Sequence, residues 1–203
     1  SKHNTIGEDT LRVARRALEE LHARFDGLVI GNHAPDFCAG GANIMLLLLE
    51  AQEGNWDDLD LAVRSLQRHN LAVRYSPQPV VAAPFGRTLA GGTEWCLPCA
   101  RIQASAETYM GLVECGIGLI PAGGGSTEMV RRAAARVPAG SDADLFPMLR
   151  WVFETIATAK VSLSAEEARQ LGFLREGDGI TMNADHLLQD AKEVCLALIR
   201  TGY

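Results

Sequence analysis

The stretch Pro79-Val80-Val81-Ala82-Ala83-Pro84, followed by Ala90-Gly91-Gly92-Thr93-Glu94, decides the fold of this chain. The apolar run predicts a short buried strand, and the glycine pair predicts a tight turn that opens a helical turn over 93–99. Two weaker copies flank it, Gly27–Ile30 with Gly40–Asn43 and Arg101–Ser105 with Ala122–Gly125. Because strand, glycine turn and helix recur in order, the sequence predicts a layered ββα spiral rather than one open sheet.

Two glutamates stand next to these turns, Glu94 in the second and Glu114 shortly before the third. Backbone amides that glycine leaves accessible can point at a developing oxyanion, and two carboxylates in one pocket can divide acid and base roles. Apolar neighbours favour burial of both, which raises a carboxyl pKa toward neutrality. The alternative is a pair of solvated surface glutamates. The pattern indicates an enzyme that acts on acyl groups through an enolate.

The composition is that of a globular protein of one domain, or of a domain with a small appendage. The chain has 203 residues, 47% hydrophobic and 22% charged, and a formal net charge of −6. This charge argues against nucleic-acid binding, and no apolar run approaches the ~18 residues of a membrane span. The polar opening Lys2-His3-Asn4 resembles no signal peptide, so we expect a cytoplasmic location. The abrupt ends suggest a piece of a longer polypeptide.

Few motifs for metals or cofactors are present. Cys96-Leu97-Pro98-Cys99 has the spacing of a zinc or redox site, but no second pair and no histidine pair accompanies it, so free thiols are favoured. Gly116-Ile117-Gly118 begins a dinucleotide fingerprint that fails at Pro121. No phosphate-binding loop and no nucleophile elbow occurs. We therefore expect no metal and no redox cofactor of its own.

Helical patterns surround and follow the strands. The periodicity predicts helices over 10–24, 44–51 and 56–75, and then over 127–137, 145–159, 164–171 and 183–200. Asn43 and Ser164 are suitable N-cap residues, and Gly172 ends the helix that Ser164 begins. These patterns divide the chain into a core over 1–135 and a helical region over 136–203, which would cover the core or mediate oligomerisation.

Three segments carry a resemblance to a known family. Phe37–Ile44, Gly86–Glu94 and Glu114–Gly125 resemble, in order, the signatures of the crotonase (enoyl-CoA hydratase/isomerase) superfamily, and 164–174 resembles a later segment. The resemblance covers nearly the whole chain and is greatest to the hydratase region of bifunctional bacterial 3-hydroxyacyl-CoA dehydrogenases. It implies an α/β fold with a crotonase-type ββα spiral core and a helical C-terminal layer. Dehydrogenase activity would need a preceding NAD-binding region, to which this chain would be fused.

The resemblance also implies roles for particular residues. The oxyanion hole would use the amides of Ala42 and Gly91, with Gly41 as the alternative to Ala42, because the first signature carries one extra residue. Glu94 would orient and deprotonate a water molecule, and Glu114 would exchange the proton at Cα. The implied reaction is hydration of trans-2-enoyl-CoA to 3-hydroxyacyl-CoA in fatty-acid β-oxidation. Ala90 departs from the family, since it replaces a glycine of the second signature.

The partner implied by the resemblance is an acyl-CoA thioester, with coenzyme A as part of the substrate. Its predicted contacts are Lys2, Gly40, Gly41, Met45, Pro121 and Gly123. Lys2 is equally a solvated terminal residue, and Met45 with Leu46, Leu48 and Leu49 would line the acyl pocket or pack in the core. A homotrimer or hexamer is implied as well. The alternative functions are an enoyl-CoA isomerase that uses Glu114 alone and a non-catalytic acyl-CoA-binding scaffold.

Overall fold

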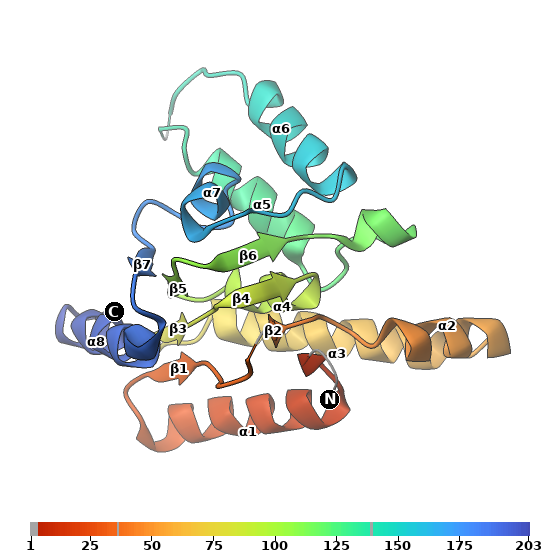
Figure 1. Cartoon of the computed structure of the whole chain (residues 1–203), viewed down its shortest axis with the longest axis horizontal. Helices are drawn as coiled ribbons and strands as arrows, with labels where there is room; N and C mark the ends of the chain where they lie inside the picture. The colour runs from red at the N-terminus through yellow and green to blue at the C-terminus, as the bar shows by residue number, and fades with distance from the viewer. Residues whose placement is uncertain (1–3, 36, 139) are drawn as a thin grey trace.

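The chain winds alternately through two parallel sheets (Figure 1). The computed structural model describes residues 4–35, 37–138 and 140–203. One sheet has the order β1-β3-β5-β7, with strands Leu28–Ile30, Val80–Ala82, Arg101–Ser105 and Gly179–Thr181. The other has the order β2-β4-β6, with strands Phe37–Ala39, Gly86–Leu89 and Thr108–Gly111. Consecutive strands thus enter different sheets, and each pair of strands is followed by a helix, which confirms the predicted ββα spiral.

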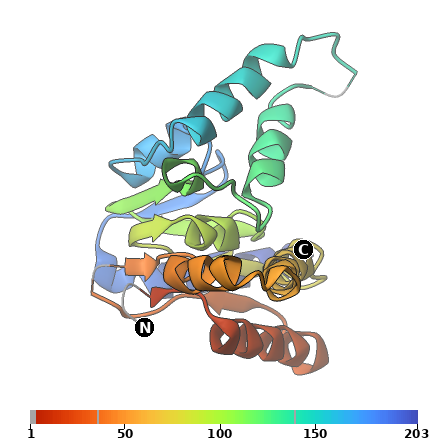
Figure 2. The same cartoon turned by 90° about the vertical axis from the view of Figure 1, so that its right-hand side faces the viewer.

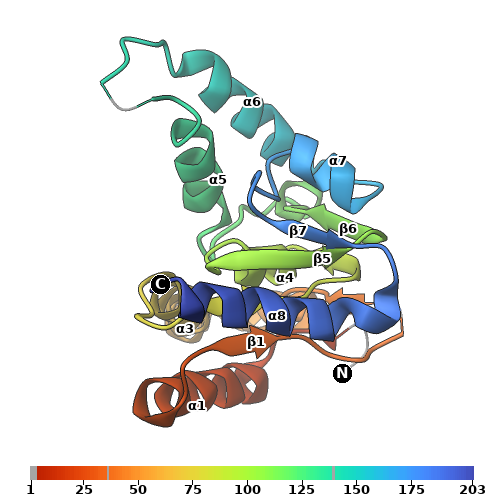
Figure 3. The ribbon, with the colours of Figure 1, turned by 90° about the vertical axis from the view of Figure 1, so that its left-hand side faces the viewer.

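The strand Val80–Ala82 is buried because both faces of its sheet are covered. Val80 and Ala82 belong to the main apolar core, whereas Val81 packs with α8 (Leu187–Arg200) through Ala191. Figure 3 shows α8 crossing this face of the sheet. A strand of a parallel sheet that is covered on both faces is expected to be a continuous apolar run. This explains why the apolar run 79–84 predicted a strand although apolar and polar residues do not alternate in it.

The helices lie close to the predicted ranges. They are α1 (Glu8–Arg24), α2 (Ile44–Glu53), α3 (Trp56–Arg74), α4 (Gly91–Cys96), α5 (Gly125–Ala134), α6 (Phe146–Ala157), α7 (Ala165–Gln170) and α8, with 3-10 turns η2 (Glu114–Ile117) and η3 (Ala184–His186). Ser164 Oγ accepts a hydrogen bond from Glu167 N at 3.1 Å, and Gly172 has φ +81°. Both signals at the ends of α7 are therefore confirmed. Figure 2 shows α5 and α6 extending away from the sheets.

Several details differ from the sequence prediction. Strands β2, β4, β6 and β7 were not predicted as strands; β4, β6 and β7 are three or four residues long and hold polar or glycine residues, and β2 is only three residues long. The region 136–203 is not helical throughout, since β7 pairs with β5. The amphipathic pattern of 56–75 favours burial of Leu71, but Leu71 is 55% exposed, and Val73 and Asn70 are buried instead. Asn43 occupies the N-cap of α2 without a side-chain hydrogen bond to the helix. The boundary at 135/136 stays a prediction.

Helix α2 does not pack in the core of this chain. Met45, Leu46, Leu48 and Leu49 are each more than half exposed, and α2 has no buried residue. The core-packing alternative for these side chains is therefore wrong, and the acyl-pocket alternative stays a prediction. In the part of the chain that the structure describes, no helix combines the length and apolar character needed to cross a membrane.

The backbone comes unusually close to itself between the first two glycine turns. A Cβ atom added to Gly92 would lie 2.3 Å from the carbonyl oxygen of Ala39, at the end of β2. Gly41 has φ +77°, and a Cβ there would lie 2.9 Å from the amide nitrogen of Gly91. Ala90, just before α4, has φ +51° and ψ −126°. Glycine is therefore required at 41 and 92, and alanine at 90 is strained.

Replacing Ala90 with glycine should stabilise the chain. The conformation at 90 is one that glycine adopts freely, and strain of about 1–3 kcal/mol is expected for alanine there. Glycine costs about 0.4–1 kcal/mol through the entropy of the unfolded chain. We expect Ala90→Gly to raise the free energy of unfolding by about 1 kcal/mol in urea denaturation. Ala62→Gly, in the middle of α3, is the matched control and should lower it by about 1 kcal/mol. A destabilised Ala90→Gly chain would contradict the strain.

Candidate active site

The first two glycine turns bring the amides of Ala42 and Gly91 together. A Cβ built on Gly91 would lie 3.3 Å from Gly41 Cα and 3.7 Å from Ala42 N. Gly91 is the first residue of α4, and the opening amides of a helix have no acceptor within the helix. Ile6 N donates to Gly41 O at 2.7 Å, which anchors the first turn. The two predicted oxyanion donors therefore lie close together on separate segments.

The side chain of Glu94 is enclosed by the third glycine turn. It is 3% exposed, and its Oε1 accepts a hydrogen bond from Gly125 N at 2.8 Å. Burial raises its pKa above the usual value for a glutamate, while the amides of Gly125, Gly123 and Gly124 act in the opposite direction. A Cβ on Gly123 would lie 2.5 Å from Glu94 Oε2, so a side chain at 123 would displace the carboxyl group of Glu94. Glu94 is thus a buried carboxyl with a fixed orientation.

Glu114 lies at the start of η2 and close enough to Glu94 to sense its charge. Its pKa is raised to about 7, chiefly by burial and also by the charge of Glu94, while its own backbone amide acts in the opposite direction. Its Oε2 atom is buried and has no hydrogen-bond partner among the described residues. An orphaned carboxyl oxygen is costly unless a ligand or water occupies the space beside it. The expectation that both glutamates are solvated surface residues is therefore wrong.

Helix α3 supports the turn that holds Glu94. Asn70 Nδ2 donates to Gly123 O at 2.8 Å, and Gln67 Nε2 donates to Ala122 O at 2.7 Å. Asn70 is buried, so its side chain forms a fixed brace under the turn. Sequence reasoning missed both residues. The available signal was the spacing of Asn70 three residues before Val73, which placed a polar side chain on the buried face of an amphipathic helix.

The other residues predicted to contact the substrate differ in burial and in hydrogen bonding. Lys2 lies outside the described residues. Gly40 N donates to Asn4 O at 3.4 Å, and Met45 is 67% exposed on α2. Pro121 is buried, and its carbonyl accepts from Ser126 Oγ at 3.5 Å. Their roles toward a substrate stay predictions.

The cysteine pair does not provide a reactive thiol. Cys96 and Cys99 are buried, and burial raises the pKa of the Cys99 thiol to about 12. A thiol with that pKa stays protonated at neutral pH, when it is neither a nucleophile nor a metal ligand. Within residues 4–35, 37–138 and 140–203, no group of three or more histidine, cysteine, aspartate or glutamate side chains could hold a metal ion.

The arrangement suits acid–base chemistry beside a carbonyl group. The amide pair of Ala42 and Gly91 could stabilise negative charge on an oxygen. Glu94 and Glu114 could move protons to or from the neighbouring carbons, since their raised pKa values lie nearer to neutral pH.

Comparisons with known sequences identify relatives of this chain. A family model described as enoyl-CoA hydratase/isomerase matches residues 1–139. A Bacillus subtilis protein described as "Probable 3-hydroxyacyl-CoA dehydrogenase" is 49% identical over 203 residues, which are 100% of this chain and 25% of that protein. Fatty acid oxidation complex subunit alpha of Vibrio cholerae is 32% identical over 157 residues, 76% of this chain and 20% of that protein. The chain spans a quarter or less of the length of these two curated relatives.

Solved structures share the fold. Enoyl-CoA hydratase from Bacillus anthracis superposes with a TM-score of 0.75 at 24% identity, over 96% of this chain and 67% of that one. Enoyl-CoA hydratase from Polaromonas sp. JS666 gives a TM-score of 0.78 at 20% identity, over 96% of this chain and 68% of that one. The predicted crotonase-type fold is confirmed.

The pKa of Glu114 should be visible as a pH dependence of stability. Below about pH 4.5 the carboxyl is protonated in both states. As the pH rises toward 7, it ionises first in the unfolded chain, so stability is lost up to the folded pKa of about 7. We expect Glu114→Gln to abolish about 2 kcal/mol of this loss, a figure discounted for partial exposure. Urea denaturation at pH 4.5 and 8 measures it. Glu107→Gln, at an exposed position, is the control. If the unchanged chain, Glu114→Gln and Glu107→Gln all lost the same free energy of unfolding between pH 4.5 and 8, the raised pKa of Glu114 would be contradicted.

Proposed function

This chain belongs to the enoyl-CoA hydratase/isomerase family, and from that premise we propose that it hydrates trans-2-enoyl-CoA to 3-hydroxyacyl-CoA. The observation that carries the proposal is a pair of glutamates, Glu94 buried and Glu114 half-buried, in which the pKa of Glu114 is raised to about 7, chiefly by burial and also by the charge of Glu94. A hydratase needs one group to deprotonate water and another to protonate carbon. Glu94, three residues after Gly91, and Glu114, which is close enough to Glu94 to sense its charge, meet that need.

The amides of Ala42 and Gly91 would hold the thioester oxygen. In the reaction, negative charge develops on this oxygen as the double bond accepts the nucleophile, so donors aimed at it stabilise the enolate more than the ground state. Each such donor contributes roughly 3–4 kcal/mol to a transition state. A Cβ position on Gly91 lies 3.3 Å from Gly41 Cα and 3.7 Å from Ala42 N, so both residues are next to Gly91; we keep Ala42 as the first donor and Gly41 as the alternative.

The proton steps follow from the two carboxyl environments. Glu94, whose Oε1 accepts the Gly125 amide, is held as the base that removes a proton from water. The oxygen of that water forms a bond to Cβ, and the electron pair of the double bond moves to the thioester oxygen as an enolate. Glu114, which is partly protonated near neutral pH, then gives its proton to Cα. Exchange with solvent restores both carboxyl groups.

The wider setting is also a proposal. Because relatives are described as a 3-hydroxyacyl-CoA dehydrogenase and as a fatty acid oxidation complex subunit, we assign the reaction to fatty-acid β-oxidation. The same comparison supports a chain that works as the hydratase part of a larger protein with an NAD-dependent dehydrogenase region. The exposed apolar residues of α2 support assembly into a homotrimer or hexamer, in which that helix would be covered.

Two other functions make different demands on the site. An enoyl-CoA isomerase would need only Glu114 as a proton shuttle, and the separately braced Glu94 favours hydration over it. Double-bond migration of a 3-enoyl-CoA, compared with hydration of crotonyl-CoA, distinguishes the two. A non-catalytic scaffold would bind crotonyl-CoA without loss of its enoyl absorbance.

Removing either carboxylate should abolish most of the turnover. We expect Glu94→Gln and Glu114→Gln each to lower kcat for crotonyl-CoA hydration by about 10²–10⁴-fold, the usual contribution of a general acid or base. Folding should be retained, because glutamine has the same shape and keeps an oxygen acceptor for Gly125 N. Glu107→Gln is again the matched control. Near-normal turnover in either active-site variant would refute the two-carboxylate mechanism.

The pH profile should show an upper limb set by Glu114. Hydration needs one proton on the glutamate pair, and that proton is lost as the pH passes about 7. We expect kcat/KM to fall about tenfold per pH unit on the alkaline side. Hydration and dehydration should give the same profile, since the overall equilibrium consumes no proton. Initial rates from pH 5 to 9 measure it, and a flat rate between pH 7 and 9 would be inconsistent with Glu114 as the acid.

A further inference from the structure

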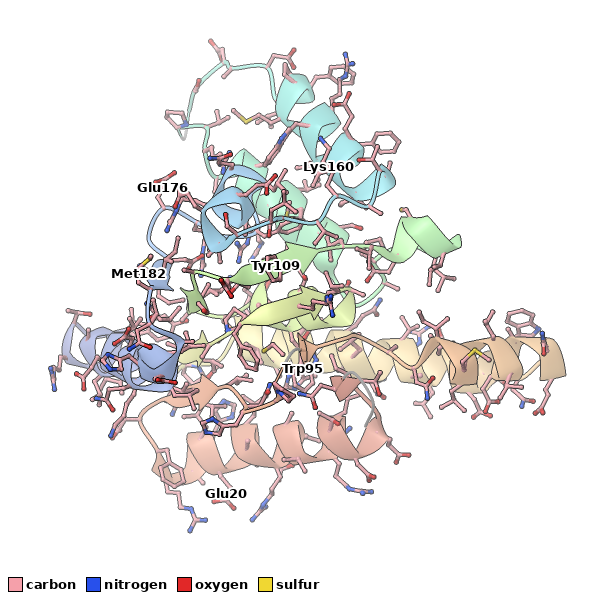
Figure 4. All side chains as sticks on the ribbon, in the orientation of Figure 1. Glu20, Trp95, Tyr109, Lys160, Glu176 and Met182 are labelled. Carbon is pink, nitrogen blue, oxygen red and sulfur yellow. The ribbon has the colours of Figure 1, made fainter. Side chains whose placement is uncertain are left out.

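A second site-like feature lies away from the glutamates, at the far end of α5. A hollow of about 290 Å³ opens there between the end of α5, the start of β5 and the connection from α7 to β7. Its wall includes four arginines, Arg101, Arg132, Arg136 and Arg175, which we call the arginine pocket. Glu176, labelled in Figure 4, lies on the connection between α7 and β7 at its edge.

The charges of the arginine pocket are not balanced by the chain. Arg175 pairs with Asp178 at 3.0 Å. For Arg101, Arg132 and Arg136, no ion pair with a carboxylate occurs within the described residues. With Glu176 counted as a second carboxylate, four guanidinium groups keep a formal excess of two positive charges. Such an excess complements a dianion.

Arg132 is the part of the pocket that most requires a counter-charge. It is 9% exposed, and its Nη1 and Nη2 donate to Phe173 O and Leu97 O, each at 2.8 Å. Its Nε–H is buried without an acceptor among the described residues. Its pKa is lowered to about 10, chiefly by burial and also by Arg175, so Arg132 is still charged at neutral pH. The charges of Asp178 and Glu128 act on Arg132, but neither forms an ion pair with it. A buried cation without a direct anionic partner is costly unless a ligand supplies one.

The remaining wall leaves room for a small anion. Gly177 places no side chain in front of Arg101, whose Nε lies 3.4 Å from where a Cβ would be. The guanidinium of Arg136 stacks over the ring of Trp151, with 5.4 Å from Cζ to the ring centroid. This contact orients Arg136 while its N–H groups stay available in the plane. Guanidinium groups in such positions bind phosphate oxygens in pairs.

We propose that the arginine pocket binds a phosphate or phosphomonoester group, at a site separate from the glutamate pair. Arg132 lies seven residues after Gly125, so the two sites are about 10 Å apart along α5. The phosphate could belong to a free phosphorylated compound or to the 3′-phosphate of coenzyme A. These sources share one chemistry, and the choice between them is experimental.

Titration calorimetry with inorganic phosphate, at fixed ionic strength, tests the site. We expect one saturable site in the chain and an affinity at least about tenfold weaker in the double variant Arg101→Gln, Arg136→Gln. Arg131→Gln, on the neighbouring face of α5 and exposed, is the matched control and should bind as the unchanged chain does. Absence of saturable binding, or equal affinity in the double variant, would overturn the proposal.

Two further arms identify the source of the phosphate. If the double variant weakens binding of coenzyme A but not of 3′-dephospho-coenzyme A, the site serves the substrate. If it weakens neither, the site serves another phosphorylated compound. Gly177→Asp provides a fixed anion, and we expect it to prevent phosphate binding and to raise the Tm by about 2–4 °C. An unchanged phosphate affinity in Gly177→Asp would count against the pocket.

Discussion

The contact between the first two glycine turns is the constraint on which the rest of this structure depends. Gly92 lies against the carbonyl of Ala39 at a distance that leaves no space for a Cβ, and Gly41 lies in the same way against the amide of Gly91. This contact holds the end of β2 in one sheet against the start of α4, which follows β4. Since Glu94 is only two residues beyond Gly92, the same contact fixes where its carboxyl group lies. Packing of the two turns and placement of a candidate catalytic group are therefore a single requirement.

The carboxyl groups show how the surroundings of one residue prepare it for a role different from that of its neighbour. Glu94 is buried, but the amides of the third glycine turn favour its charged form and partly offset the cost of burial. Glu114 has no comparable set of donors, and it experiences the charge of Glu94 as well. One proton shared by the pair is consequently most stable on Glu114. The difference in role thus follows from glycine amides that surround one carboxyl group and not the other.

Sequence reasoning predicted the spiral and most helices, because these features follow from local patterns, whereas the roles assigned to the site residues stay predictions. An apolar run such as 79–84 and a glycine pair such as 91–92 carry their meaning within a few residues. The spacing of Asn70 before Val73 indicated a buried polar side chain, but its partner Gly123 could not be predicted, because one hydrogen bond joins positions 53 residues apart. The exposure of α2 was equally unreadable, since its composition is that of a core helix. Local sequence preference decides whether a helix or strand forms, whereas tertiary contacts decide which surface of the protein it covers.

Helix α5 connects the candidate active site with the arginine pocket. Its first residue, Gly125, donates its amide to Glu94, as expected where the positive end of a helix dipole meets a carboxylate. Its last turns carry Arg132 and are followed by Arg136, as expected where the negative end favours cations. The dipole of one helix therefore favours the ionised form of Glu94 at one end and a cluster of guanidinium groups at the other. An anion in the pocket would relieve the repulsion between those groups and fix the end of α5, whose opposite end orients Glu94. Phosphate binding and the position of the carboxylate would in that case be linked mechanically through a single helix.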